Sequence, residues 1–484
     1  MSTIDELKKV RLQKLRSLEK TGFLAYPATT KRTHSISEVL DNFSKLSKTK
    51  KTVVLTGRIL ALRGHGGATF LDIQDGSKIQ ALIKEDKLGE KGYKFFIDYF
   101  DIGDFIEIKG VLFKTKRGEK TIEAQDYKML AKSLLPLPEK WHGFQDIEER
   151  LRKRYLDILF NPEVKEMIKK RAVFWNSMRE FLMEKGFLEV ETPVLETTTG
   201  GADAKTFETH HNALDLDVYL RISTGELWQK RLMIAGFEKT FEIGRQFRNE
   251  GMDAEHLQDY TQMEFYWAYA DYKQGMKLVE EMYKYVIKKT FGTLKFKIKN
   301  FNVDFSKKWE IYDYRTIINK YAKIDIFEAS LPEIEKQLVK LDIAYDKKGF
   351  NKTRAIDNLL KYCRKNIAGP GFLINLPTDV LPLAKKSDNP KIVQAFQVIL
   401  AGSENGKGYS ELNDPIDQAE RFAQQQKLRE QGDQEAQMFD YDFVEALEYG
   451  MPPTCGFGVS ERLFSFLMDK SIRECQIFPL MRPK

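Results

Sequence analysis

The sequence predicts an α+β protein of several domains, in which a small β-barrel precedes a larger body of strands and helices. The chain has 484 residues, which at about 150 residues per domain favours two or three domains. Hydrophobic residues make up 42% of the chain and aromatic residues 12%, enough to fill more than one core. β-rich runs crowd residues 51–132, whereas strand and helix patterns alternate beyond residue 160.

The first fifty residues are expected to form a basic helical extension. Over residues 4–20, apolar side chains lie near one helical face, and Lys8, Arg11 and Lys14 recur at intervals of three on another. The net charge is +7, and this whole excess falls within the first 150 residues. A basic end on a neutral body indicates a region that binds a polyanion, although a solvated helical surface explains the pattern equally well.

Residues 51–135 are expected to form a closed barrel of the OB-fold type. Five short β-rich runs, separated by turns that contain glycine, are predicted at 52–60, 68–73, 78–83, 105–113 and 120–129. This fold commonly binds oligonucleotides. Phe70 can stack on a base, and Gln80 and Glu119 can hydrogen-bond to base edges. Taken alone, each of the three is better explained as a core or surface residue.

A linker is expected over residues 136–160, opened by Pro136 and Pro138, and a second domain over 161–484. Helices are predicted at 163–185, 271–289 and 332–341. Strands are predicted at 187–190, 218–222, 239–244, 262–269, 371–376 and 395–401. The lysine-rich stretch 290–370 is expected to be a largely helical insertion.

Several classes of protein are excluded by what the sequence lacks. No run of about 18 uncharged apolar residues occurs, and the first residues lack the pattern of a secretory signal, so we expect a cytoplasmic protein without a membrane span. Three distant cysteines and six scattered histidines do not suit a disulfide framework or a zinc site. Phosphate-binding loops and nucleophile elbows are also missing.

Two stretches of the second domain carry charged residues suited to nucleotide chemistry. Residues 241–250 and 261–266 are predicted to pair as a long hairpin, with Arg248 and Glu250 on one strand face. Arg248, which can bind phosphate or carboxylate, would then project beside Glu250, which can accept a hydrogen bond from an amino group. A structural ion pair between the two residues explains their spacing equally well. Residues 450–463 are predicted to be a strand-to-helix junction, which places Arg462 near a helix N-terminus, where anions are favoured.

Together, these regions resemble the three motifs of the class II aminoacyl-tRNA synthetases, and the similarity to the lysyl-tRNA synthetases is close. The first motif is the helix and strand that end at Pro193, the second is the Arg248 hairpin and the third is the Arg462 helix. Further matching stretches are residues 113–116, 137–143, 209–215, 409–415 and 477–483. The resemblance covers nearly the whole chain and implies a homodimer on an antiparallel sheet of six or seven strands.

The resemblance also implies a role for each matching residue. It implies catalytic roles for Arg248 and Arg462. It implies ATP contacts for Arg248, Glu250, His256, Tyr260, Glu404 and Arg462. It implies lysine contacts for Gly201, Glu226, Arg248, Glu264, Tyr266, Tyr409 and Glu411. Phe70, Gln80 and Glu119 match the residues that read the anticodon of tRNA(Lys).

Magnesium is the implied cofactor, with ATP as substrate and Glu404 as the principal protein ligand. The chain departs from the usual pattern at Gln397, where the family usually has a glutamate, and at Lys407, where it usually has asparagine. Residues 221–226 are one residue longer than usual, and Leu257-Gln258 replaces the common Asn-Pro. A neutral Gln397 adds no charge to a metal site.

Two other functions stay open at this point. An aspartyl- or asparaginyl-type ligase would share the barrel and the motifs, and Lys407 would suit its substrate, but Glu411 would repel aspartate. A catalytically silent tRNA-binding relative is the second alternative. The presence of Arg248, Glu250, Glu404 and Arg462 argues against it.

Overall fold

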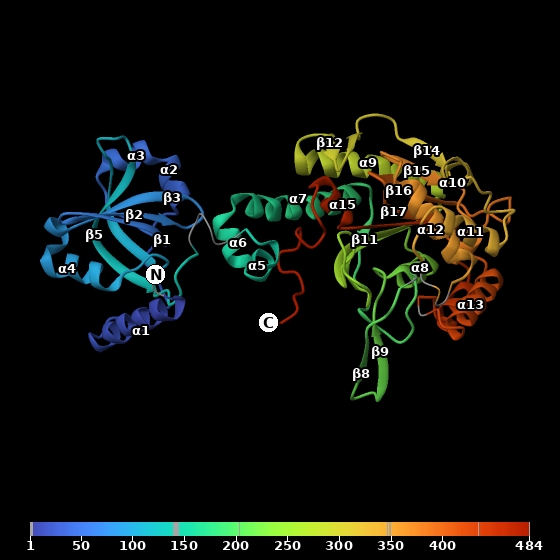
Figure 1. The fold of residues 1–484 in the computed structure, drawn as a ribbon, viewed down its shortest axis with the longest axis horizontal. Coiled ribbons are helices and arrows are strands. Elements are labelled where there is room, and N and C mark those ends of the chain that lie inside the picture. Colours follow the sequence, from blue (N-terminus) through green and yellow to red (C-terminus); the bar gives the residue numbers. More distant parts are fainter. Residues whose placement is uncertain are drawn as a thin grey trace. The chain divides into compact units, whose positions relative to one another are not determined.

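The computed structural model describes residues 3–138, 145–202, 204–345, 347, 350–433 and 435–483, and its chain divides after residue 145 into two units (Figure 1). Residues 1–145 form the first unit and residues 146–484 the second. Each unit has its own hydrophobic cores. The matching stretch 137–143 lies outside the described residues from position 139 onward.

A closed five-stranded barrel forms the first unit. Its strands are β1 (Val53–His65), β2 (Ala68–Gln74), β3 (Lys78–Lys84), β4 (Phe105–Lys114) and β5 (Lys120–Ala131). The strand order is β1-β2-β3-β5-β4, and β1 pairs with β4 to close the barrel. All neighbours are antiparallel except β3 and β5. All five predicted strands are present, with β1 extended to His65.

Four helices accompany the barrel. They are α1 (Ile4–Lys20), α2 (Ile36–Asp41), α3 (Phe43–Thr49) and α4 (Glu85–Tyr99). Leu18, Ile36 and Phe43 are buried in the same core as the barrel interior, so the N-terminal extension packs as part of this unit. The sequence analysis did not predict α4, because Gly89 and Gly92 interrupt its helical pattern and Gly89 adopts a positive φ inside it.

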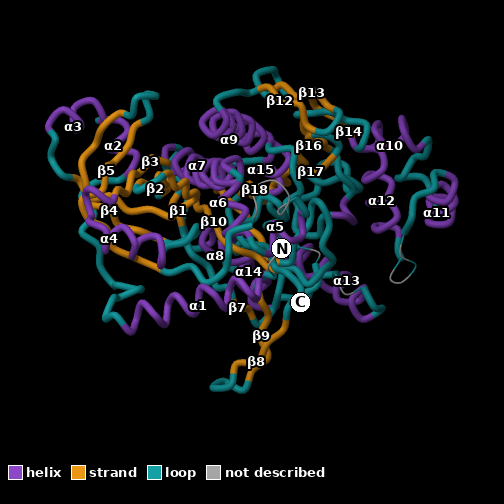
Figure 2. Tube along the Cα trace, turned by 60° about the vertical axis from the view of Figure 1, so that its left-hand side comes forward, coloured by secondary structure: helices purple, strands orange, loops and turns teal. Residues whose placement is uncertain are grey.

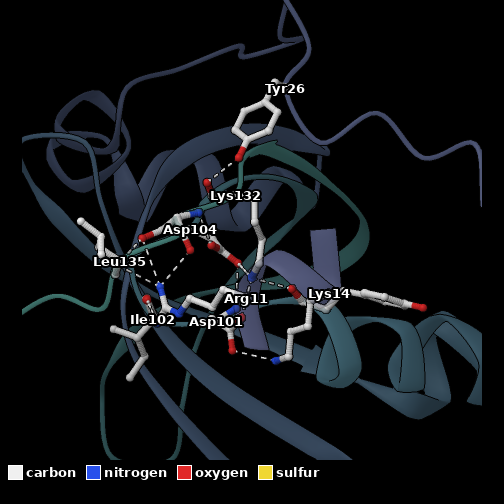
Figure 3. A network of polar contacts seen from close by, with 10 residues as sticks. Arg11, Lys14, Tyr26, Asp101, Ile102, Asp104, Lys132 and Leu135 are labelled. Atoms are coloured by element: carbon white, nitrogen blue, oxygen red, sulfur yellow. Dashed lines mark hydrogen bonds and ion pairs between the residues drawn. The ribbon is translucent and has the colours of Figure 1, made fainter. Parts of the chain in front are cut away.

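The basic face expected on α1 is only partly free, because Arg11 and Lys14 point toward the barrel (Figure 3). The Arg11 guanidinium donates to the carbonyl oxygens of Ile102, Ser133 and Leu135 at 2.9–3.1 Å. Lys14 forms a 2.8 Å ion pair with Asp101. Grouping Arg11 and Lys14 with an exposed polyanion-binding face was therefore wrong, since both cations already have partners.

An eight-stranded sheet forms the centre of the second unit. Its order is β14 (Glu310–Asp313), β15 (Gly371–Ile374), β16 (Ala395–Leu400), β17 (Ser403–Ser410), β18 (Thr454–Ser460), β11 (Asp259–Ala268), β10 (Lys239–Phe247) and β6 (Leu188–Glu189). The six central strands are antiparallel, whereas β14 and β6 add parallel pairs at the two edges. The resemblance implied six or seven strands, and the sheet has eight because these two short strands are added at its edges.

Two long helices lie side by side against this sheet, α7 (Pro162–Glu184) and α9 (Tyr272–Phe291) (Figure 2). Their buried faces share one core with the sheet, which includes Phe174, Phe241, Phe265, Phe396 and Phe457. Further helices of this unit are α5 (Ile147–Arg152), α6 (Arg154–Phe160), α8 (Glu226–Ile234), α13 (Pro415–Glu430), α14 (Tyr441–Glu448) and α15 (Arg462–Leu467), with a 3-10 turn at Thr378–Val380. A small sheet of β7 (Leu195–Glu196), β9 (Leu216–Leu220) and β8 (Glu208–His211) completes the unit, and its β8–β9 hairpin projects outward (Figure 1).

The stretch expected to be a helical insertion is helical only from Tyr314. It begins with the hairpin β12 (Lys295–Ile298) and β13 (Phe301–Asp304) and with β14, and continues through α10 (Tyr314–Ala322), α11 (Leu331–Lys340) and α12 (Lys352–Arg364). Phe305 and Trp309 are buried in the core of the main sheet. The strands were missed because each has only four residues, too few for their alternation to stand out in a lysine-rich stretch.

Among the described residues, the structure has no helix with both the length and the apolar character that a bilayer span requires.

Candidate active site

Two adjoining cavities lie along β11, β17 and β18 and the loops around them. The first has a volume of about 230 Å³ and the second of about 490 Å³. Arg248, Glu404, Lys407 and Arg462 line both, so the cavities meet at these side chains. The remaining expected site residues divide between the two. The first cavity holds Gly201, Glu226, Tyr260, Glu264, Tyr266, Tyr409 and Glu411, and the second holds Glu250, His256 and Gln397.

Arg248 lies just beyond the hairpin that was expected to carry it. β10 pairs with β11 from Lys239 to Phe247 and ends there, so Arg248 and Glu250 lie in the connecting loop and the prediction of a shared strand face was wrong. The loop is held in place because the Arg248 amide donates to the carbonyl oxygen of Gln258 at 2.7 Å. The guanidinium donates to the carbonyl oxygen of Ile222 at 3.3 Å and lies 5.8 Å from the ring centre of Tyr260.

Three buried carboxylates gather in the first cavity. Glu226 begins α8, Glu264 lies on β11 and Glu411 directly follows β17. Glu226 accepts from the hydroxyl of Tyr409 at 2.5 Å, and Glu264 accepts from the hydroxyl of Tyr266 at 3.0 Å. Tyr266 thus bonds to Glu264 in this structure, and Oε1 of Glu411 has no hydrogen-bond partner within the described chain.

Two glycines make room for these carboxylates. Gly201 has a φ of +89°, and a Cβ atom there would come within 2.9 Å of a carboxylate oxygen of Glu226. Gly456 on β18 pairs with Tyr266 and Tyr409, and a Cβ atom there would lie 2.1 Å from Oε1 of Glu411. Any side chain at either position would therefore displace a carboxylate of the cavity.

Burial and mutual repulsion change the acidity of these carboxyl groups. Burial, reinforced by the charge of Glu226, raises the pKa of Glu264 to about 7. Burial likewise raises the pKa of Glu411 to about 8, since the nearby ammonium of Lys230 offsets only part of the desolvation. A cation that enters the first cavity would therefore favour the ionised form of both groups.

Five lysines and arginines and five aspartates and glutamates line the second cavity. Arg462 donates from its terminal nitrogen to the carbonyl oxygen of Glu404 at 3.2 Å, and its Nε has no hydrogen-bond partner within the described chain. Nδ1 of His256 lies 2.8 Å from Asp253. Burial raises the pKa of the Tyr260 hydroxyl, although Arg248 and Arg462 oppose this. A polyphosphate would find guanidinium groups here whose positions are already fixed.

The residues at Gln397 and Glu404 fit a metal ion that is held jointly with a phosphate ligand. Oε1 of Gln397 is buried, has no hydrogen-bond partner in the described part of the chain and belongs to a residue that lines the second cavity. The nearest cation to the Glu404 carboxylate is Arg364, at 3.8 Å. Within the described residues, no group of three or more His, Cys, Asp or Glu side chains is placed to hold a metal ion alone. Substrate oxygens would therefore have to complete the shell.

Lys407 lies directly opposite Gln397 on the paired strands β16 and β17. No hydrogen bond or ion pair joins its ammonium group to any described residue. Gln397 and Lys407, two of the positions where the family resemblance led us to expect other residues, are thus cross-strand neighbours. Gln397 is neutral where a glutamate was expected, and Lys407 is positive where an asparagine was expected.

In the barrel, Phe70 lies on the outer face of β2. Leu71 and Ile73 on the same strand point to the opposite face and are buried in the core. Gln80 on β3 and Glu119 in the β4–β5 turn come together at Thr121. The Thr121 hydroxyl lies 3.0 Å from Oε1 of Gln80 and 3.2 Å from the carbonyl oxygen of Glu119. The alternative that Phe70 fills the barrel core does not hold, since the core excludes it.

One charged residue of the site was missed by the sequence analysis. Lys230 on α8 is 1% exposed and forms ion pairs with Glu226 at 2.8 Å and with Glu411 at 2.5 Å. In the sequence, Glu226 and Lys230 form an ordinary i, i+4 pair, a pattern most often found on a solvated helix surface. The distant partner Glu411 cannot be read from this spacing.

Comparisons with known proteins agree with this geometry. The family described as tRNA synthetases class II (D, K and N) matches residues 146–482, and the OB-fold nucleic acid binding domain matches residues 53–130. The larger match spans the unit that holds both cavities. The chain belongs to the class II tRNA synthetases, and the predicted fold class is confirmed.

Curated relatives narrow the family further. The lysine--tRNA ligase of Carboxydothermus hydrogenoformans is 43% identical over 99% of this chain and 99% of that protein. Those of Thermosipho africanus and a Thermoanaerobacter species are 41% and 44% identical over 99% of this chain and 97% of each relative. Within the class, the chain thus falls among the lysine--tRNA ligases. Membership implies ATP, an amino acid and tRNA as substrates.

Proposed function

We propose that the chain activates lysine with ATP to form lysyl-adenylate and transfers the lysyl group to the 3′ end of tRNA(Lys). The observation that carries the proposal is the first cavity, where three carboxylates adjoin a junction that holds the guanidinium groups of Arg248 and Arg462. Substrate lysine brings two ammonium groups and one carboxylate. The ammonium groups match the acids of the first cavity, and the carboxylate matches Arg248 at the junction.

Amino-acid specificity follows from the charge of the first cavity. We assign Glu226 to the α-ammonium, and Glu411 with Tyr266 to the ε-ammonium, with Glu264, Tyr409 and Gly201 beside them. The free Oε1 of Glu411 offers a charge-assisted hydrogen bond to a ligand ammonium. Aspartate would place a further anion against these three acids, and asparagine would leave a buried carboxylate unpaired.

ATP would occupy the second cavity, with its α-phosphate at the junction and its adenine beside Tyr260, which lines the first cavity. The lysine carboxylate then attacks the α-phosphorus, a bond forms between them, and the bond to the β-phosphate oxygen breaks as pyrophosphate leaves. Arg248 lines both cavities, and it would offset the charge that develops at the α-phosphate. Arg462 and His256 are assigned to the terminal phosphates, Tyr260 to stacking on adenine and Glu250 to the adenine amino group.

Magnesium is proposed as the cofactor, held by Glu404 together with ATP oxygens and assisted by the carbonyl oxygen of Gln397. When bound, the ion would neutralise phosphate charge and orient the triphosphate. The unpartnered Oε1 of Gln397 supports this assignment.

The barrel is proposed to bind the tRNA anticodon through Phe70, Gln80 and Glu119. Phe70 would stack on a base, and Gln80 and Glu119, which meet at Thr121, would read base edges. Because tRNA is used in translation, we propose a cytoplasmic location for the protein.

A homodimer is proposed to form along the edge strand β6 and the segment that follows it. Leu188, Val194 and Leu195 are 42–50% exposed there, which leaves apolar side chains beside an unpaired sheet edge. Light scattering should give twice the chain mass, and Leu195→Lys should shift the protein toward monomer. A monomeric wild-type chain would contradict this arrangement.

Pyrophosphate exchange with each of the standard amino acids, without tRNA, tests the central proposal. Lysine should be the one that supports exchange. Exchange with aspartate or asparagine would favour the other members of the family, and no exchange with any amino acid would favour a silent tRNA-binding protein.

A further inference from the structure

Lys230 is a fully enclosed cation at the base of the first cavity. Besides its ion pairs with Glu226 and Glu411, its ammonium lies 5.6 Å from the ring centre of Tyr409 and 5.8 Å from that of Phe443 on α14. Its side chain does not line the cavity, so a ligand would meet the two carboxylates and not the lysine. Lys230 thus joins the two acids assigned to the two different ammonium groups of the substrate.

We propose that Lys230 is a positioning and charge-balancing residue, which sets the lysine pocket to accept two ammonium groups and no other charge. This inference rests on the proposed function. Arg248, Glu404, Lys407 and Arg462 also line the first cavity, but at its junction with the second one. Away from the junction, Glu226, Glu264 and Glu411 contribute three negative charges in the occupied pocket, and Lys230 neutralises one of them. The two negative charges that remain match the positive charges of the two ammonium groups of substrate lysine. The substrate carboxylate is not part of this balance, because it is assigned to Arg248.

The surroundings of Lys230 explain why the pocket needs a fixed internal cation. Its titratable partners are Glu226 on its own helix and Glu411 beyond β17. Glu264 and Tyr266 on β11 and Tyr409 on β17 interact in turn with these two carboxylates. Burial alone would lower the pKa of Lys230, but Glu226 and Glu411 outweigh burial and raise it. Lys230 therefore stays charged while the pocket is empty and limits the repulsion between its two partners.

Removal of this cation should change how lysine affinity depends on pH. Without Lys230, Glu226 and Glu411 would repel one another and take up a proton in the empty pocket more readily. Lysine would then have to displace that proton, so its affinity would be weak at low pH and recover as the pH rises. A residue that merely fills space would weaken lysine binding equally at every pH.

The test measures lysine and ATP binding to the full chain by calorimetry between about pH 6.5 and about pH 8.5, where the free lysine side chain stays charged. Lys230→Gln removes the charge, and Lys230→Arg retains it. Arg231→Gln is the matched control, because it removes the neighbouring cation of α8, which pairs with Asp440 at 3.2 Å instead. Thermal melts establish that each variant is folded, and Lys230→Met replaces Lys230→Gln if the latter is not.

For Lys230→Gln, the lysine Kd should rise at least about tenfold near pH 7, and the ratio of the variant Kd to the wild-type Kd should fall as the pH rises to about 8.5 without reaching one, because Glu411 already has a raised pKa in the wild type. The ATP Kd should stay within about twofold. Lys230→Arg should keep the wild-type pH dependence of the lysine Kd. Arg231→Gln should change the Kd of neither lysine nor ATP. Unchanged lysine binding in Lys230→Gln, or an equal loss at every pH in both Lys230 variants, would overturn the inference. A wild-type chain that does not bind lysine would instead contradict the proposed function, and the inference would fall with it.

Discussion

Glu411 shows how burial and charge act together at a single residue. Its carboxylate is 1% exposed, its Oε2 atom pairs with Lys230, and its Oε1 atom has no partner in the described chain. Such a group is costly in an empty pocket and gains most from an incoming cation. Discrimination between amino acids should therefore depend on this side chain more than on the shape of the cavity.

Replacement of Glu411 by glutamine should weaken lysine recognition selectively. The change removes a charge-assisted hydrogen bond worth about 1.5–3 kcal/mol, so the lysine KM should rise at least about tenfold. The ATP KM should change little, because Glu411 does not line the second cavity. Steady-state pyrophosphate exchange measures both constants.

Glu196→Gln is the control for Glu411→Gln. Glu196 is also buried, and burial raises its pKa to about 7, but it accepts from Trp228 and lines neither cavity. Its replacement should leave the lysine KM unchanged. If Glu411→Gln also left the lysine KM unchanged, Glu411 would not belong to the lysine pocket.

The motifs in the sequence pointed to residues that line the two cavities, but they did not reveal the contacts between those residues and their buried neighbours. Arg248 and Glu411 belong to stretches with recognisable motifs, so their chemistry could be anticipated. Lys230 could not, because its significance depends on burial and on a partner 181 positions away. The same holds for Gly456, whose closeness to Glu411 depends on the pairing of β18 with its neighbours.

At the scale of elements, the pair β16–β17 carries Gln397 and Glu404, the two residues proposed to hold magnesium, with Lys407 opposite Gln397. Gln397→Glu would restore a negative charge beside Glu404 and opposite Lys407. Because Gln397 lines the second cavity, the new carboxylate should be tolerated. It should lower the magnesium concentration needed for half-maximal exchange, since hard cations prefer carboxylates to amides.

Three measurements together test this prediction. A magnesium titration of exchange gives the midpoint, calorimetry of ATP with and without magnesium gives metal-dependent binding, and a thermal melt reports stability. Glu404→Ala should abolish exchange and serves as the comparison. An unchanged magnesium midpoint with a large fall in melting temperature would mean that position 397 serves packing and not the metal.

The helix α1 makes a separate prediction about tRNA binding. Lys8, Lys9, Arg16 and Lys20 are exposed and have no ion-pair partner among the described residues, whereas Arg11 and Lys14 bind the barrel. Replacement of these four by glutamine should flatten the salt dependence of tRNA affinity, with a slope change of about 0.7–0.9 per lost phosphate contact. Lys14→Gln is the control and should leave the slope unchanged. An unaltered slope in the fourfold variant would exclude α1 from tRNA binding.

Element prediction succeeded where the alternation of side chains was regular. The five barrel strands alternate clearly, because one face of each packs into the core. It failed at α4, where two glycines interrupt the helical pattern, and at β12 and β13, which have only four residues each. It also extended the Arg248 strand too far, since the ladder ends at Phe247.

At the scale of the whole molecule, the two units have separate cores and separate proposed tasks. Formation of lysyl-adenylate needs only the cavities of the second unit. Transfer to tRNA needs the barrel as well, because the anticodon is proposed to bind there. A change in the outer face of the barrel should therefore separate the two reactions.

Phe70→Ala makes this separation measurable. Loss of one stacked base should cost about 1–3 kcal/mol, which raises the tRNA KM in aminoacylation. Lysine-dependent pyrophosphate exchange without tRNA should remain at the wild-type rate, because Phe70 lies outside the unit that holds the cavities. Phe105→Ala is the matched control, since Phe105 is 37% exposed on β4 and contacts Arg58. It should affect neither reaction. An equal loss of exchange and aminoacylation in Phe70→Ala would mean that the substitution disrupts folding, and no loss of aminoacylation would remove Phe70 from the anticodon site.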